Sequence, residues 1–311
     1  MVATDRSLLE SLVVDFDEAD AKFKRMLRNY NTVKSVFGND SVLMGGWAVE
    51  LYCPSTRRQH KDLDIFVIDE EHTKRSRLTY ELSYSGYYHC PTIHEGAFCS
   101  DEGLEIEIFY SDGSFPFVIT SLMSRRDFLT DSVNVSVKLS KKKPELFGIL
   151  SSAFKRSSED EAVALTDSDM RITTESSEIR VASPRSLILM KARAYACRRS
   201  QYDSKDIISL IDTKYSGIEN FLRTESEFMR TSNKRFSNYL RYVFNEDPLS
   251  NMLYLDNMKT RGESRFPLVE RAVSSLPADE LAAMAGLASC VLSAYYLLPV
   301  QEVYDNIHFS V

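Results

Sequence analysis

Apolar and polar residues alternate at two places in the first part of the chain, and both places carry acidic residues. Asp62 and Asp64 flank a single leucine in Asp-Leu-Asp-Ile-Phe-Val, residues 62–67, and Leu-Glu-Ile-Glu-Ile-Phe at 104–109 alternates throughout. Successive side chains of a strand point to opposite faces of a sheet. The pattern therefore predicts two strands, each with a pair of carboxylates on one face.

The rest of the pattern divides the chain into a mixed first part, residues 1–182, and a mostly helical second part, residues 183–311. Helical periodicity and strand-like runs intermingle in the first part, which predicts an α+β domain followed by a helical one. Ser183 and Pro184 suit the N-cap and first position of a helix at this boundary. Further expected elements are helices at 7–30, 70–86 and 281–298, a loop or strand pair at 86–98, strands at 115–122, 132–139 and 179–181, and a basic turn at 140–144.

Two glycines precede the first acidic strand. Gly45 and Gly46 follow an apolar run and open a helix-like segment, residues 47–52. Glycine permits a tight turn and lets backbone N–H groups approach a phosphate at a helix N-terminus. The hard oxygens of Asp62 and Asp64, together with substrate phosphates, suit magnesium. The order strand, glycine turn, helix and acidic strand predicts a nucleoside triphosphate site, although a solvated acidic strand also explains Asp-x-Asp taken alone.

Two blocks carry a resemblance to a known family: Gly-Gly-Trp-Ala at residues 45–48 and Arg-Gln-His-Lys-Asp-Leu-Asp at residues 58–64. With these motifs the sequence resembles the nucleotidyltransferase superfamily, the polymerase-beta-like fold. It is similar both to the aminoglycoside and lincosamide nucleotidyltransferases and to the abortive-infection and toxin branch. The resemblance implies a mixed sheet flanked by helices, followed by a helical domain that completes the active site.

The resemblance also implies a third carboxylate on a neighbouring strand, so that two magnesium ions can flank the reacting phosphate. Glu107 fits the family's acid-apolar-apolar pattern best, and Glu105 is the second choice. Asp62, Asp64 and Glu107 are then the metal ligands, and Arg58 offsets triphosphate charge. The family more often has aspartate at the third position, and an edge strand with a solvated acidic face is the alternative interpretation.

A second block lies downstream, where Lys191 is followed by Arg198-Arg199 and then by Lys205-Asp206. This order resembles a later motif of the toxin and abortive-infection branch. The resemblance implies that Lys191 binds the triphosphate and that Asp206 is a general base or a substrate-orienting group. The family often has a second aspartate at the position of Ser209. The alternatives are an exposed helical lysine and an ordinary acidic helix start.

Composition and charge narrow the cellular context and the partner. No apolar run approaches the roughly 20 residues that span a bilayer, and the first residues lack the design of a signal peptide. Five scattered cysteines suit reduced thiols, so we expect a cytoplasmic protein without membrane contact. A net charge of −7 argues against a wide nonspecific nucleic-acid surface. The spacing of one group of possible zinc ligands matches no familiar finger: His89, Cys90, His94 and Cys99.

The expected function is transfer of a nucleoside monophosphate from a nucleoside triphosphate (ATP, GTP or CTP) to an acceptor hydroxyl, with release of pyrophosphate. The toxin-like branch implies tRNA or protein as the acceptor and an antitoxin protein as a partner. An antibiotic acceptor is the alternative within the same chemistry. A nucleotide-binding regulatory module without turnover is the alternative from a different class.

Overall fold

The structure is a computed structural model of the 311-residue chain. It describes the following residues: 14–16, 21–54, 60, 62–69, 72–93, 95–110, 132–144, 170–231, 266–274, 276–298, 303–305 and 307. Arg58, and the strand expected at 115–122, lie outside the described residues.

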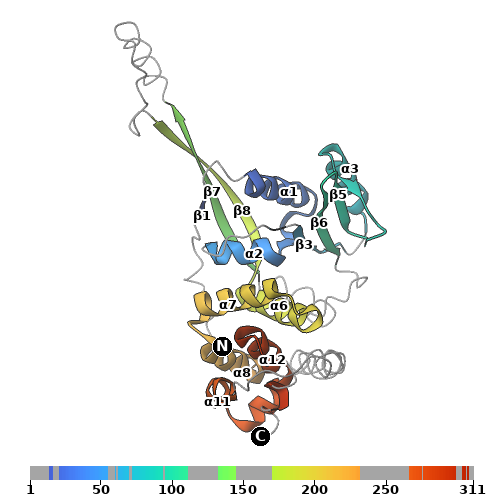
Figure 1. The fold of residues 1–311 in the computed structure, drawn as a ribbon. Helices are drawn as coiled ribbons and strands as arrows, with labels where there is room; N and C mark the ends of the chain where they lie inside the picture. Colours follow the sequence, from blue (N-terminus) through green and yellow to red (C-terminus); the bar gives the residue numbers. More distant parts are fainter. Residues whose placement is uncertain are drawn as a thin grey trace, which may run out of the picture.

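Within these residues one mixed sheet has the strand order β1-β7-β8-β2-β3-β6-β5-β4 (Figure 1). The pairs β1–β7, β8–β2 and β3–β6 are parallel and the other neighbours are antiparallel. Helices flank the sheet, so the expected α+β class is confirmed at this level. The strands are β1 (Val14–Phe16), β2 (Ser41–Leu43), β3 (Leu63–Val67), β4 (Tyr88–His89), β5 (Ala97–Ser100), β6 (Gly103–Tyr110), β7 (Ser132–Pro144) and β8 (Met170–Ala182).

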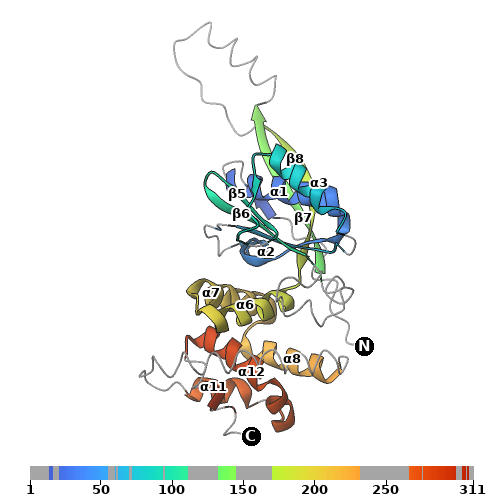
Figure 2. The ribbon, with the colours of Figure 1, turned by 90° about the vertical axis from the view of Figure 1, so that its right-hand side faces the viewer.

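The helices on the sheet come from the first part of the chain, and those of the second part form further layers on one side of it (Figures 1 and 2). They are α1 (Ala21–Phe37), the 3-10 turn η2 (Gly38–Asp40), α2 (Gly45–Tyr52), α3 (Arg75–Tyr84), α6 (Pro184–Arg198), α7 (Gln201–Tyr215), α8 (Ile218–Thr231), α11 (Phe266–Val273) and α12 (Ala278–Tyr296). None of the described helices has the length and apolarity needed to cross a membrane.

Several local predictions are confirmed. A helix lies within 70–86, and strands cover 132–139 and 179–181. The strand pair expected at 86–98 is β4 with β5, although β5 continues to Ser100. The α6 helix begins at Pro184, and the Ser183 hydroxyl accepts a hydrogen bond from the Ser186 N–H at 3.1 Å, which is the expected N-cap. The helix expected at 281–298 is α12, whose described apolar residues are mostly buried.

Two local predictions are wrong, and long-range strand pairing is the reason in both cases. The helix expected at 7–30 begins only at Ala21, because Val14–Phe16 pair with β7 as a parallel strand. The basic turn expected at 140–144 is instead the end of β7, whose pairing with β8 continues through Lys141↔Thr173 to Pro144↔Met170. Local periodicity contains no information about partners this distant in the chain.

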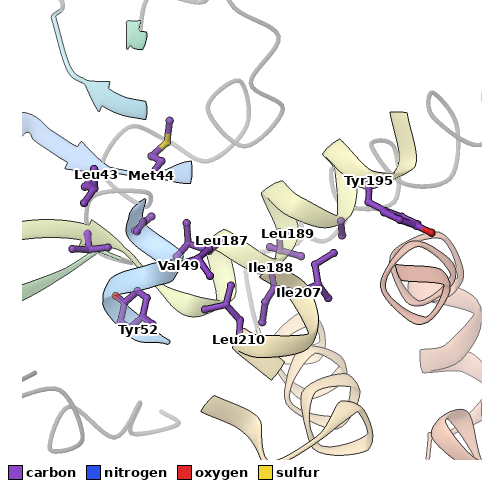
Figure 3. Packing of buried hydrophobic residues seen from close by; sticks show 14 of the residues in the cluster. Leu43, Met44, Val49, Tyr52, Leu187, Ile188, Leu189, Tyr195, Ile207 and Leu210 are labelled. Atoms are coloured by element: carbon purple, nitrogen blue, oxygen red, sulfur yellow. The ribbon is translucent and has the colours of Figure 1, made fainter. Parts of the chain in front are cut away.

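The first and second parts of the chain share one cluster of buried apolar residues. Figure 3 shows Val49 of α2 close to Leu187 of α6, with Leu210 of α7 beside them. The Cys53 thiol, at the end of α2, donates a hydrogen bond to the Ser209 carbonyl oxygen at 3.5 Å. Because α2 begins at Gly45, this packing fixes the second part of the chain relative to the glycine turn.

A buried ion pair joins α6 to α8. Arg185 donates from Nε and Nη2 to the two carboxylate oxygens of Glu225, at 2.7 and 2.8 Å, and the Glu225 side chain is fully buried. The Arg185 guanidinium also lies 3.7 Å from the centre of the Phe228 ring. Because both charges have lost water, each depends on the other.

We predict that Glu225→Gln destabilises the protein by about 3–5 kcal/mol, because it leaves the buried Arg185 charge without its carboxylate. Urea denaturation followed by circular dichroism measures the change. Glu219→Gln is the matched control, since Glu219 pairs with Arg271 at the surface, and it should cost less than about 1 kcal/mol. Equal effects of the two substitutions would contradict the prediction.

Candidate metal and nucleotide site

Three carboxylates converge at one place on the sheet. Asp64 on β3 lies directly opposite Glu107 on β6 in the parallel register, and Asp62 stands one residue before β3 begins. One oxygen from each of the three lies within 4.8 Å of the others, and all three residues are partly buried. The alternation seen in the sequence therefore brings together the three predicted metal ligands.

Glu105 belongs to a different arrangement, although it shares a strand with Glu107. It accepts a hydrogen bond from Arg25 Nη2 at 2.6 Å and another from the Ser100 hydroxyl. Tyr87 lies nearby, with its hydroxyl 3.4 Å from a Glu105 oxygen. Of the two glutamates weighed from the sequence, Glu107 lies in the carboxylate cluster, and Glu105 binds α1.

Gly45 provides the space that Asp64 occupies. Its φ is +66°, a conformation that favours glycine. A Cβ atom built on Gly45 would lie 1.7 Å from Asp64 Oδ2. The Met44 N–H also donates to the Asp64 carbonyl oxygen at 2.9 Å. The predicted glycine turn is therefore present, with Gly45 and Gly46 as the first residues of α2, and it lies against the carboxylate cluster.

The carboxylates disturb one another electrostatically. Burial raises the pKa of Asp64, the charges of Asp62 and Glu107 raise it further, and the value reaches about 8. The charge of Lys191 acts in the opposite direction. A divalent cation would offset the same repulsion, and three oxygen donors at this separation are the ligand chemistry that magnesium or manganese prefers. The residues present therefore fit such an ion.

The charge of Lys191, on α6, acts on Asp64 of the cluster, and its ammonium is paired with carboxylates of α7. Its side chain is almost fully buried, and Nζ lies 2.8 Å from Asp206 Oδ2 and 3.4 Å from Asp203 Oδ1. Lys191 and Asp206, singled out separately from the sequence, thus form one ion pair. Asp203 was not expected from the sequence, where its only signal is its place on α7 one turn before Asp206.

A second residue that sequence reasoning left without a role is His60. Its Nε2 lies 2.7 Å from Glu50 Oε2, both side chains are buried, and the ring packs against Trp47 in a tilted arrangement with the centroids 4.6 Å apart. Glu50 and Trp47 belong to α2, whereas His60 lies just before Asp62. This contact ties the chain that leads into the carboxylate cluster to the helix that begins at Gly45.

The described residues contain no other cluster of potential metal ligands. In particular, Cys90 and Cys99 interact with each other, and His89 contacts the Glu95 carbonyl oxygen. His94, the fourth residue considered for zinc, lies outside the described residues.

No protein-family model matches the sequence, and no curated protein matches it. The interpretation of the site depends on the geometry of its own residues.

We predict that Gly45→Ala abolishes divalent metal binding, because the added Cβ displaces the Asp64 carboxylate. Isothermal titration with Mn²⁺ measures the loss. Gly38→Ala is the matched control, because Gly38 has nearly the same φ, +64°, but open space where the Cβ would go. It should cost about 1–2 kcal/mol of stability through backbone strain and leave Mn²⁺ affinity unchanged. Retained binding in Gly45→Ala would contradict the steric account.

We also predict that added Mg²⁺ raises the melting temperature more at pH 8 than at pH 6. The pKa of Asp64 is about 8 in the folded protein, against 3.8 for an ordinary aspartate. The folded state therefore holds this proton more tightly than the unfolded chain does. The stabilisation that results is complete below about pH 4 and is lost as the pH rises to about 8. At high pH a bound cation offsets the charge of the ionised Asp64, and fewer protons compete with the cation for the carboxylate. Thermal melts in EDTA and in Mg²⁺ test this. Asp64→Asn should remove the pH-dependent difference.

Proposed function

We propose that the protein is a magnesium-dependent nucleotidyltransferase that transfers a nucleoside monophosphate from a nucleoside triphosphate to an acceptor hydroxyl. The observation that carries the proposal is the convergence of Asp62, Asp64 and Glu107 beside Gly45, with Lys191 acting on the cluster from α6. A nucleotidyltransferase fold, with a catalytic domain at 1–182 and a helical domain at 183–311, is part of the same proposal.

In the proposed reaction the acceptor oxygen attacks the α-phosphorus. A bond forms between them, the bond from the α-phosphorus to the bridging oxygen breaks, and pyrophosphate leaves with the electron pair. The acceptor hydroxyl loses its proton to solvent water. Two magnesium ions, when bound, would polarise the α-phosphate and make the attacking hydroxyl more acidic. Asp62, Asp64 and Glu107 would hold these ions, and the turn at Gly45 and Gly46, where α2 begins, would place backbone N–H groups near the phosphates.

Lys191 and Asp206 have linked roles in this proposal. The ammonium of Lys191 stabilises the negative charge that develops on pyrophosphate. Asp206 lies 2.8 Å from that ammonium and is only 4% exposed. This geometry favours the orienting role for Asp206 over that of a general base, because its carboxylate holds Lys191 in place.

The acceptor follows from the resemblance to the toxin and abortive-infection branch, which points to tRNA or protein in the cytoplasm and to an antitoxin as a partner. A small antibiotic would require the same chemistry with a different acceptor pocket. ATP, GTP and CTP are all candidate nucleotide substrates.

We predict that the wild type transfers label from an α-³²P-labelled nucleoside triphosphate into total RNA or cell protein when Mg²⁺ is present. Asp64→Asn should lower this transfer at least about a hundred-fold, since loss of a metal ligand costs more than the 10- to 100-fold typical of outer-shell partners. Gels and scintillation counting measure it, with an aminoglycoside panel in parallel.

Glu105→Gln is the control for this experiment. It changes a carboxylate on the same strand that pairs with Arg25 instead of joining the cluster, so transfer should persist. Nucleotide binding without transfer to any acceptor would indicate a regulatory nucleotide-binding module instead of an enzyme. Full activity in Asp64→Asn would refute the metal site.

A further inference from the structure

Asp203 links two cations that come from α6. Its side chain is fully buried, yet it accepts hydrogen bonds from Arg198 Nε at 2.6 Å and Arg198 Nη2 at 2.8 Å. Its Oδ1 also lies 3.4 Å from Lys191 Nζ. A buried carboxylate therefore fixes a buried ammonium and a guanidinium together.

Arg198 differs from Lys191 in its exposure. The Arg198 side chain is 62% exposed, although the carboxylate that holds it is completely buried. A guanidinium has five N–H groups, and the contacts with Asp203 use one at Nε and one at Nη2. The Nη1 group and the outer hydrogen of Nη2 are therefore available to another anion, in an orientation set by two hydrogen bonds.

The electric field at Arg198 includes the carboxylate cluster. Hydrogen bonding to Asp203 is the main cause that raises the pKa of Arg198, and the charges of Asp64 and Asp62 raise it further. The geometric link to the cluster is Asp203, which contacts both Arg198 and the Lys191 ammonium, and the charge of Lys191 acts on Asp64.

The balance of charge indicates which ligand would bind there. Once Asp64 is ionised, as it would be beside a bound cation, five carboxylates (Asp62, Asp64, Glu107, Asp203 and Asp206) and two cations (Lys191 and Arg198) leave an excess of three negative charges among these side chains. Two divalent cations would turn this into a small positive excess. With metal bound, the group then attracts a polyanion with several phosphates, and Arg198 is its exposed hydrogen-bond donor.

We propose that Arg198 is a second phosphate-binding residue, that it contacts the β- or γ-phosphate of the nucleotide, and that Asp203 is the positioning residue that aims Arg198 and Lys191. This inference rests on the proposed function, because it places the triphosphate at the carboxylate cluster. A plain surface ion pair at the end of α6 is the competing explanation. Such a pair would affect stability only slightly and phosphate binding not at all.

Binding of tripolyphosphate in the presence of Mg²⁺ tests the inference without depending on the base or the acceptor. Isothermal titration of Arg198→Gln should show about 10- to 100-fold weaker binding than the wild type, the range for charge-assisted hydrogen bonds. Arg198→Lys keeps the charge but loses the forked geometry, so its affinity should fall between the two. Arg223→Gln removes one exposed charge on α8 and should bind as tightly as the wild type.

A double-mutant cycle tests the positioning role of Asp203. Asp203→Asn should weaken tripolyphosphate binding, and adding Arg198→Gln to it should cause much less further loss than Arg198→Gln does alone. Additive losses would show that Asp203 does not act through Arg198. If Asp203→Asn fails to fold, the exposed Arg198 variants still decide whether the guanidinium binds phosphate.

The outcomes separate this inference from the proposed function. If the wild type binds tripolyphosphate and Lys191→Ala weakens binding while Arg198→Gln does not, the role of Arg198 is wrong and the proposed site survives. If the wild type binds no tripolyphosphate with Mg²⁺, both the proposed nucleotide site and this inference are overturned. With any active nucleotide, Arg198→Gln should raise KM more than it lowers kcat.

Discussion

Mutual repulsion among Asp62, Asp64 and Glu107 is the constraint around which this structure is arranged. Carboxylate oxygens within 4.8 Å of one another are unfavourable unless positive charge lies close by. The parallel pairing of β3 with β6 creates this proximity, since it sets Asp64 opposite Glu107. Gly45 permits it sterically, because any side chain there would occupy the position of the Asp64 carboxylate.

Positive charge reaches the cluster from a different part of the chain. Lys191 lies on α6, and its position depends on how α6 and α7 pack against α2, through contacts such as those among Val49, Leu187 and Leu210 shown in Figure 3. The same α2 helix begins at Gly45. The short α2 helix therefore connects the apolar packing around Val49 with the position of the Asp64 carboxylate beside Gly45. Asp203 and Asp206 complete the arrangement by restricting the Lys191 ammonium.

Local patterns were enough to predict the acidic strands, the glycine turn and the α6 N-cap, because alternation and capping depend on neighbours in sequence. They failed at Val14–Phe16 and at 140–144, where pairing with distant strands decides the conformation. Alternation also placed Glu105 and Glu107 on one face without distinguishing them, and only the contact of Glu105 with Arg25 separates their roles. The role of Asp203 could not be predicted for a similar reason. In the sequence it looks like any solvated acid on a helix, and only the packing of α6 beside α7 brings it to Lys191 and Arg198.

The strand order has a consequence for the growing polypeptide. β2 lies between β3, its near neighbour in sequence, and β8, which follows roughly 130 residues later. A nascent chain that has emerged only as far as β6 already holds all three carboxylates, but it lacks one neighbour of β2 and every cation of α6. β2 gains its second neighbour when β8 has been synthesised, and the carboxylates gain Lys191 and Arg198 only when synthesis has passed α6. A ribosome-bound or truncated chain that ends before β8 is therefore an acidic, incompletely paired sheet that also lacks the cations of α6.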